Sequence, residues 1–282
     1  MLFRSGHSLG TGSPLPRQDV TPILTLQRQI KSAGEIALLQ KAANASMLAH
    51  RAAMKAIKPD VGENVIDGLI YATLRDEGCE RVSYASIVGS GPNSTQLHYS
   101  DDSRVMKAGD LVVIDAGGEY SMYAADITRT MPVSGSFTPR QREIYNIVLG
   151  AQQAAAAAFV SGKSTLGSIA MRSGPPNDSL DRVAYEYINS HGKDLHGEPL
   201  GKYFIHSMGH SVGVDVHDGM LPTEVLKPGA VFTIEPGIYI PEENIGVRIE
   251  DTFYVDANGK LVNMSASLPH TAEDVEAAMK AK

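Results

Sequence analysis

Four carboxylates in this sequence stand in or beside apolar segments that are typical of β-strands. They are Asp115 in VVIDAG, Asp126 in AADIT, Glu235 in FTIEPG and Glu250 in VRIED. Carboxylates that are buried together strongly raise one another's pKa, so such a set needs positive charge nearby if it is to stay ionised. Divalent cations supply it directly, and carboxylates joined by one or two imidazoles suit Mn²⁺, Co²⁺ or Zn²⁺ in a two-metal site.

Three of the nine histidines lie within FIHSMGHSVGVDVHDG, at His206, His210 and His217. Alternation of His206, Met208 and His210 places these side chains on one face of a strand or extended segment. A lone histidine is more often a packing or surface residue, but three within twelve residues, among Gly and Ser, indicate a site. One imidazole can ligate metal while others donate to an oxyanion or shuttle a proton.

An internal repeat links these residues. VMKAGDLVVIDAGGEY, from Val105, aligns without gaps on VLKPGAVFTIEPGIYI, from Val225, with identity at five of the sixteen positions. The repeat places Asp115 on Glu235, each at the end of an apolar strand before a glycine turn. Related halves packed about a pseudo-twofold axis would bring equivalent strand ends together, and here those ends carry carboxylates.

The elements that must position the site are mixed helices and short strands. Apolar spacing predicts helices from Lys31 to the break at Lys58, over 64–77, 140–160 and 180–190, and at the C-terminus. Strands are predicted over 83–89 and 111–115, and in short segments between 201 and 255. This mixture indicates the α+β class.

Composition excludes several classes of protein. The 282 residues carry 25 Lys and Arg against 32 Asp and Glu, a formal charge of −7 without a basic run, which disfavours nucleic-acid binding. No apolar stretch reaches the roughly 18 residues of a membrane span. Cys79, the single cysteine, excludes an intrachain disulfide framework, and the phosphate-binding loop and HExxH motifs are absent.

Residues 1–30 are rich in Gly, Ser, Thr and Pro and show no apolar period. We expect them to be an unpacked lead-in or the remnant of a missing N-terminal domain, with the catalytic domain at 31–282. They lack the continuous apolar segment of a signal peptide, which favours a cytoplasmic location.

The set Asp115, Asp126, His210, Glu235 and Glu250 resembles the ligands of the pita-bread metallopeptidases, and the resemblance covers about residues 28–256. HSMGHSVGVDVHD, TIEPGIYI and GVRIEDT are similar to the proline-directed branch, aminopeptidase P and prolidase. Methionine aminopeptidases differ around the ligand histidine, and creatinase lacks the ligands. The resemblance implies a pita-bread fold, with duplicated half-domains around a curved antiparallel sheet.

The resemblance also implies two divalent ions, with Mn²⁺ favoured over Co²⁺ or Zn²⁺. Asp115 and Asp126 would hold one ion, His210 and Glu235 would complete the other, and Asp126 and Glu250 would bridge both. A hydroxide between the ions would attack the carbonyl of the residue before proline. Glu235 would accept its proton and deliver it to the proline nitrogen.

Further side chains are assigned through the same resemblance. His98, His206 and His217 would line the substrate side and stabilise the oxyanion, and Tyr239 and Arg248 would bind near the metals and the proline end. The expected activity is hydrolysis of the N-terminal Xaa-Pro bond of peptides. Two alternatives stay open, a prolidase restricted to Xaa-Pro dipeptides and a non-catalytic pita-bread binding module. The oligomeric state is also open, with a homodimer as one option.

Overall fold

The computed structural model describes residues 19–174 and 179–281. Its helices agree closely with the periodicity of the sequence, and two of them begin with capping boxes, at Ser32 and Thr138. The helices are α1 Thr21–Gln29, α2 Ala33–Ala56, α3 Glu63–Asp76, α4 Pro139–Ala158, α5 Leu180–Ser190 and α6 Ala272–Lys280.

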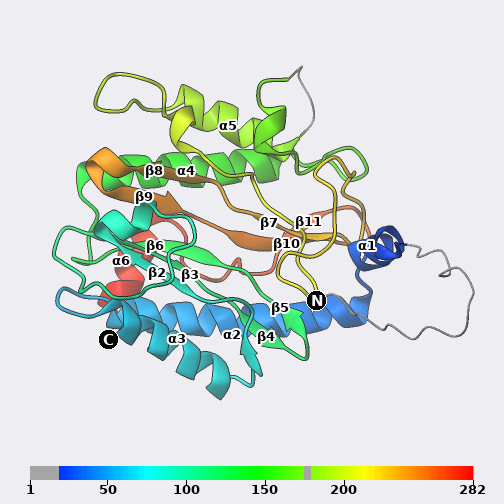
Figure 1. Cartoon of the computed structure of the whole chain (residues 1–282), viewed down its shortest axis with the longest axis horizontal. Helices are drawn as coiled ribbons and strands as arrows, with labels where there is room; N and C mark the ends of the chain where they lie inside the picture. Colours follow the sequence, from blue (N-terminus) through cyan, green and yellow to red (C-terminus); the bar gives the residue numbers. More distant parts are fainter. Residues whose placement is uncertain (1–18, 175–178, 282) are drawn as a thin grey trace, which may run out of the picture.

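The strands are short, and the pairs between them are antiparallel, in the orders β2-β3-β6, β11-β10-β7, β1-β4-β5 and β8-β9. They are β1 Arg81–Val82, β2 Ile87–Ser90, β3 Leu111–Asp115, β4 Gly118–Tyr120, β5 Tyr123–Ala124, β6 Thr128–Pro132, β7 Val231–Ile234, β8 Gly237–Ile240, β9 Ile245–Arg248, β10 Asp251–Val255 and β11 Leu261–Asn263. Figure 1 shows α2 and α3 on one side of these strands and α4 and α5 on the other.

The repeat of the sequence is a repeat of structure. Its first copy forms β3 and β4 and its second copy forms β7 and β8. The glycine before each copy's first strand has the same left-handed backbone, with φ +90° at Gly109 and +89° at Gly229. β3 pairs with β6 and β7 pairs with β10, while a bridge between Thr128 and Glu250 joins the two halves. The equivalent strand ends therefore meet at one seam, as the sequence predicts.

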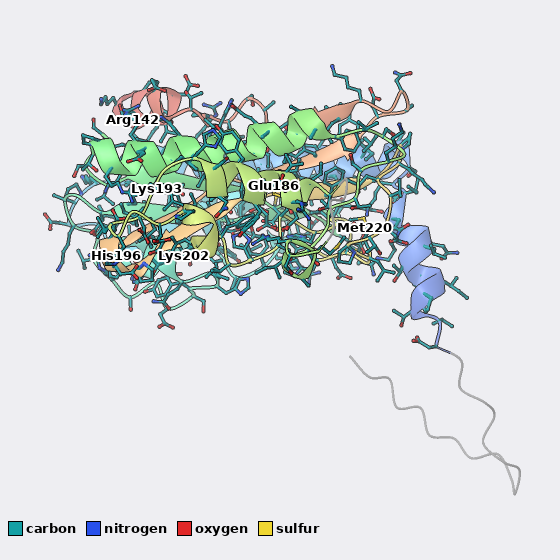
Figure 2. All side chains as sticks on the ribbon, turned by 90° about the horizontal axis from the view of Figure 1, so that it is seen from above. Arg142, Glu186, Lys193, His196, Lys202 and Met220 are labelled. Atoms are coloured by element: carbon teal, nitrogen blue, oxygen red, sulfur yellow. The ribbon has the colours of Figure 1, made fainter. Side chains whose placement is uncertain are left out.

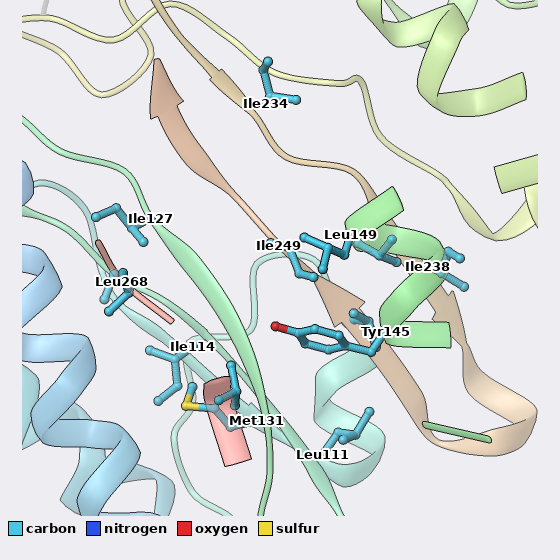
Figure 3. Close-up of a cluster of buried hydrophobic side chains, with 14 of the residues drawn as sticks. Leu111, Ile114, Ile127, Met131, Tyr145, Leu149, Ile234, Ile238, Ile249 and Leu268 are labelled. Atoms are coloured by element: carbon cyan, nitrogen blue, oxygen red, sulfur yellow. The ribbon is translucent and has the colours of Figure 1, made fainter. Parts of the chain in front are cut away.

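Apolar side chains from both halves and from α4 fill the space between the layers. Tyr145 and Leu149 of α4 lie against Ile249 and Ile238, and the same cluster continues to Ile114 of β3 (Figure 3). Because the cluster spans both halves, the strand ends that carry the carboxylates rest on one rigid support.

Two segments differ from the sequence-based expectation. Residues 21–29 form α1, a helix of only nine residues with no side-chain N-cap and no buried residue, at the end of a stretch whose Gly, Ser, Thr and Pro content predicts irregular structure (Figure 2). The strand expected over 83–89 starts only at Ile87, because Ser83 and Tyr84 turn their side chains to Ala125 and the carboxylates. Residues 1–18 lie outside the described residues, and the assignment of 1–30 and 31–282 as separate units stays a prediction.

Candidate metal centre

A cavity of about 540 Å³ opens where the two halves meet, and nearly every predicted site residue lines it. The end of β3 brings Asp115 and the β5–β6 connection brings Asp126, while the end of β7 and the β9–β10 junction bring the two glutamates. The predicted residues in its wall are His98, Asp115, Asp126, His206, His210, His217, Glu235, Arg248 and Glu250. Tyr239 is buried behind the wall and reaches the site through His206 and Arg248.

Three of the five predicted ligands are already grouped. Asp126, His210 and Glu250 each offer one ligand atom, and these atoms lie within 4.8 Å of one another. His210 Nε2 lies 3.3 Å from Asp126 Oδ2 and 3.4 Å from Glu235 Oε1. Oxygen donors from three carboxylates around one imidazole nitrogen are the donor set that divalent transition metals accept.

The backbone orients the imidazole of His210 for this role. Its Nδ1 lies 3.1 Å from the carbonyl oxygen of Ser211, so Nδ1 carries the proton and donates it there. Nε2 is left to face the carboxylates, as in metal sites where the second nitrogen fixes the tautomer. The residues present therefore fit a divalent cation.

In the metal-free protein, bound protons supply the positive charge that a metal ion would supply. Burial raises the pKa of Glu235 to about 7, and burial with the charge of Asp126 raises the pKa of Glu250 well above its usual value. Burial alone would lower the pKa of His210, but Asp126 and Glu235 outweigh it and raise this pKa to about 9. Protonation thus relieves the repulsion that a metal would relieve in the loaded protein.

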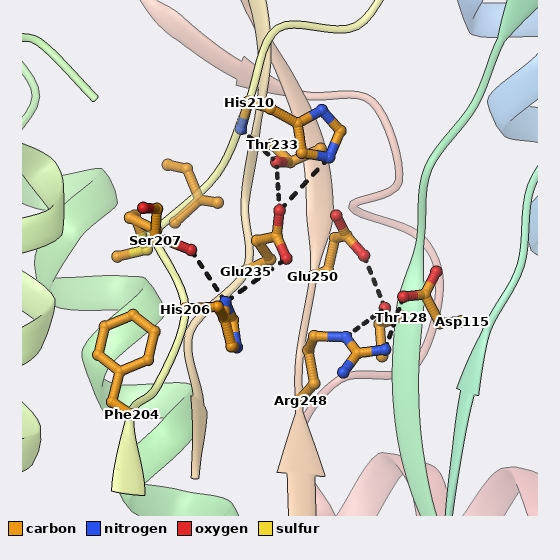
Figure 4. A network of polar contacts seen from close by, with 12 residues as sticks. Asp115, Thr128, Phe204, His206, Ser207, His210, Thr233, Glu235, Arg248 and Glu250 are labelled. Atoms are coloured by element: carbon orange, nitrogen blue, oxygen red, sulfur yellow. Dashed lines mark hydrogen bonds and ion pairs between the residues drawn. The ribbon is translucent and has the colours of Figure 1, made fainter. Parts of the chain in front are cut away.

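Asp115 stands apart from the grouped ligands. Arg248 Nη2 donates to its Oδ2 at 2.6 Å, and the Tyr84 hydroxyl contacts its Oδ1 at 2.5 Å (Figure 4 shows the arginine contact). Burial would raise the pKa of Asp115, but Arg248 and Tyr84 together lower it. Asp115 is therefore ionised and held in place at the edge of the site.

Tyr84 is the site residue that sequence reasoning missed. Its hydroxyl lies 2.5 Å from Asp115 Oδ1 and 2.6 Å from Asp126 Oδ1, between the two aspartates. Burial and these two charges raise its pKa well above 10, so it stays a phenol and a donor. A single tyrosine in SYASIV belongs to no recognisable motif. The two aspartates lie 31 and 42 residues later in the sequence, and only the fold brings them to the Tyr84 hydroxyl.

The comparisons with known proteins agree with this geometry. The sequence profile described as metallopeptidase family M24 matches residues 37–257, which is most of the chain. The chain belongs to this family. The fold described above is the pita-bread fold of M24 proteins.

Curated relatives carry names from the proline-directed branch. The chain is 36% identical to "Xaa-Pro aminopeptidase" of Escherichia coli over 99% of its own length and 66% of the relative's. It is 38% identical to "Xaa-Pro dipeptidase" of Pyrococcus furiosus over 82% of its length and 62% of the relative's. The M24 chain therefore spans about two thirds of the length of these relatives.

Solved structures give the same likeness. Escherichia coli aminopeptidase P in complex with substrate superposes with a TM-score of 0.79 at 34% identity, covering 93% of this chain and 62% of that one. A zinc-substituted form of the same enzyme with product superposes equally well, at 35% identity.

A relay of hydrogen bonds runs along one wall of the M24 site. His206 Nδ1 donates to the carbonyl of Ser207 at 2.9 Å, so its Nε2 accepts from the Tyr239 hydroxyl at 2.9 Å. Tyr239 in turn accepts from Arg248 Nη1 at 2.8 Å. Burial and the nearby Arg248 lower the pKa of His206 to about 3, so this imidazole is neutral. In this arrangement both nitrogens of His206 are engaged, and its role toward an oxyanion stays a prediction.

Threonines and a buried arginine support the glutamates. The Thr128 hydroxyl donates to Glu250 at 2.6 Å, and the Thr233 hydroxyl donates to Glu235 at 3.1 Å. Arg129 is fully buried, pairs with Asp251 at 2.7 Å, and donates to the backbone carbonyl of Glu250. Hydrogen bonds to the side chains of Glu235 and Glu250, and to the backbone of Glu250, therefore hold these two glutamates in place.

We predict that Tyr84→Phe lowers divalent-metal affinity by about 10–100-fold, since the loss of outer hydrogen bonds to metal ligands usually has this cost. The ring and its packing remain, so the fold should persist. Calorimetric titration of the metal-free protein with Mn²⁺ measures the effect, with Tyr71→Phe on the exposed face of α3 as the control. Unchanged affinity would show that the hydroxyl does not orient the aspartates.

We predict that Arg248→Met destabilises the metal-free protein by about 3–5 kcal/mol, because removal of one partner leaves the other charge buried and unpaired. Arg248 and Asp115 are both buried, and they lie 2.6 Å apart. Urea unfolding measures the loss. The double variant with Asp115→Asn should regain much of the stability; if it does not, the loss comes from packing.

No helix in the two described stretches combines the length and apolar character needed to cross a bilayer.

Proposed function

We propose that this chain is the catalytic part of a metal-dependent aminopeptidase that hydrolyses the N-terminal Xaa-Pro bond of peptides. The observation that carries the proposal is the meeting of the predicted ligands and histidines of both halves in one cavity. The names of the relatives add support for the proline-directed substrate class.

Divalent ions bound here would polarise the scissile carbonyl and supply a nucleophile at neutral pH. Glu235 faces the same space, with a pKa raised to about 7, which suits a group that takes a proton and returns it near neutral pH. His98 and His217 stand exposed in the cavity wall, where their N–H groups can reach an oxyanion.

Proline at the second position fits this kind of site. The Xaa–Pro amide lacks an N–H, so an enzyme that recognises the substrate backbone through that N–H loses a contact. A site that acts on the carbonyl oxygen is independent of this N–H. The ammonium group of the first residue finds a surrounding of carboxylates, which complements its charge.

The number and identity of the metal ions, and their ligands, are part of the same proposal. Two ions, with Mn²⁺ favoured over Co²⁺ or Zn²⁺, are supported by the oxygen-rich donor set. Asp115 would complete the first ion's ligands together with Asp126. The homodimer, the cytoplasmic location and the absence of nucleic-acid partners stay predictions.

One assay tests the proposal and its rivals. With Mn²⁺ present, Xaa-Pro dipeptides, Xaa-Pro-Yaa tripeptides and Met-Ala-Ser are compared at equal concentration. Release of the first residue from tripeptides supports the aminopeptidase, while cleavage of dipeptides alone indicates the prolidase. Cleavage of Met-Ala-Ser alone overturns the proline-directed assignment. Metal binding without hydrolysis of any of the three indicates the binding module.

A further inference from the structure

A buried ion pair between Lys31 and Asp218 connects the segment before α2 to the loop that joins His210 and His217. Lys31 Nζ lies 3.1 Å from Asp218 Oδ2, and each side chain is only 1% exposed. The backbone N–H of Lys31 donates to the carbonyl of Gly229 at 2.8 Å, which fixes the lysine relative to the second half. Lys31 precedes the residues that match the family profile, and no sequence motif marked it.

The Lys31 ammonium contacts both ends of one loop. Besides Asp218, it lies 3.4 Å from the Ser211 hydroxyl. Ser211 directly follows His210, and Asp218 directly follows His217. The backbone of Asp218 also donates to the carbonyl of Ser211 at 2.9 Å, so residues 211–218 form a loop that is closed at its base.

The two histidines beside this base face each other in the cavity. The rings of His210 and His217 meet edge to face, with centroids 4.2 Å apart. His217 is an exposed side chain at the end of its loop, so its position follows the backbone at Asp218. The distance between the predicted ligand and the predicted oxyanion donor is thereby linked to the Lys31 contact.

The absence of a side chain at Gly213 makes space for this ion pair. A Cβ atom at Gly213 would lie 2.0 Å from Asp218 Oδ2 and 3.0 Å from Lys31 Cε, so only glycine fits there. The other carboxylate oxygen of Asp218 pairs with Arg28 Nε at 2.6 Å on the outer side. A buried pair of charges survives only with such close partners.

We propose that Lys31 and Asp218 are positioning residues that hold His217 against His210, so that the oxyanion donor stands at its working distance from the metal centre. This inference rests on the proposed function. It places a segment outside the profile match in the support of the site.

The test uses Lys31→Met and the double variant Lys31→Met/Asp218→Asn, in which neither charge is left buried alone. Both should keep the fold and lower kcat/KM for an Xaa-Pro-Yaa tripeptide by about 10–100-fold, the usual effect of losing outer support. Arg142→Met breaks a more exposed ion pair between α4 and α6 and serves as the control (Figure 2 labels Arg142). Activity of the double variant equal to that of the control would overturn the proposal.

A coupling experiment separates positioning from general destabilisation. In a His217→Ala background, the double variant should cause little further loss of kcat, because the group that it positions is gone. Losses that multiply independently in the two backgrounds would overturn the proposal. This comparison distinguishes positioning from a lowered Tm alone.

A spectroscopic measurement tests the positioning of His217 without relying on catalysis. Imidazole ¹⁵N resonances of the metal-free protein should shift for His217 in the double variant and stay unchanged with Arg142→Met. An unmoved His217 signal would overturn the positioning role. Inactivity of the wild-type protein on every peptide, with the shift present, would instead refute the proposed function and leave the structural inference standing.

Discussion

Asp126→Asn should reduce the bound metal from the proposed two ions per chain to less than one, and should reduce the proposed Xaa-Pro hydrolysis at least about 10³-fold. Asp126 lies in the closely grouped set with His210 and Glu250, and it is the carboxylate expected to bridge both ions. Metal charge is worth several kcal/mol in the transition state, and each 1.36 kcal/mol is tenfold in rate. Elemental analysis after reconstitution with Mn²⁺, together with tripeptide hydrolysis, measures both losses.

The same substitution should leave the metal-free protein folded. Loss of the Asp126 charge removes its repulsion with Glu235 and Glu250, but it also removes the attraction to protonated His210. A cooperative thermal unfolding transition of Asp126→Asn without metal, combined with lost metal, shows that the fold is intact. Asp274→Asn on the exposed start of α6 is the control and should change neither quantity. Two ions retained by Asp126→Asn would contradict the ligand assignment.

Metal affinity will rise steeply with pH between 6 and 8. In the metal-free protein the pKa of Glu235 is raised to about 7 and that of His210 to about 9, so both carry protons at pH 6. A cation must displace these protons before it binds. Each displaced proton makes the affinity change by about tenfold per pH unit below its pKa. Glu235 is half deprotonated at pH 7, so we expect at least about a 50-fold tighter Kd at pH 7 than at pH 6, measured by calorimetric titration with Mn²⁺.

Stability of the metal-free protein should move in the opposite direction. A group whose pKa is raised on folding contributes stability that is complete below its unfolded pKa and is lost as pH rises through the folded value. For Glu235 this interval runs from about 4.5 to about 7, and for His210 from about 6.5 to about 9. The Tm of the metal-free protein should therefore fall from pH 6 to 9, while the increase caused by Mn²⁺ grows. A metal-induced increase in Tm that does not depend on pH would contradict the protonation states derived above.

Much of the site was predictable because its signals are local. Each carboxylate sits in or beside an apolar segment, and the glycine turns of the repeat force the same backbone at Gly109 and Gly229. The helix expected over 140–160 was predictable from its apolar spacing, because that spacing repeats within a few residues, and the structure has it as α4. α1 was missed because it is only nine residues long, has no side-chain N-cap and follows a stretch rich in Gly, Ser, Thr and Pro.

The supporting residues were not predictable, because their partners are distant in sequence. Tyr84 reaches its carboxylates across 31 and 42 positions, and Lys31 reaches Ser211 across 180. Neither belongs to a spacing pattern, and either residue in isolation would be interpreted as an ordinary surface or strand side chain. His206 illustrates the same limit, since only the contacts with Ser207 and Tyr239 show that its two nitrogens are already engaged.

The sequence by itself determined which side chains can bind metal and that two related halves present them, because residue type and strand-end position are local properties of the chain. The tertiary structure decided which ligands are grouped, where the protons lie and which distant residues hold the histidines. These depend on distances and burial, since electrostatic energy is set by the separation of charges in the folded protein and by the water excluded around them.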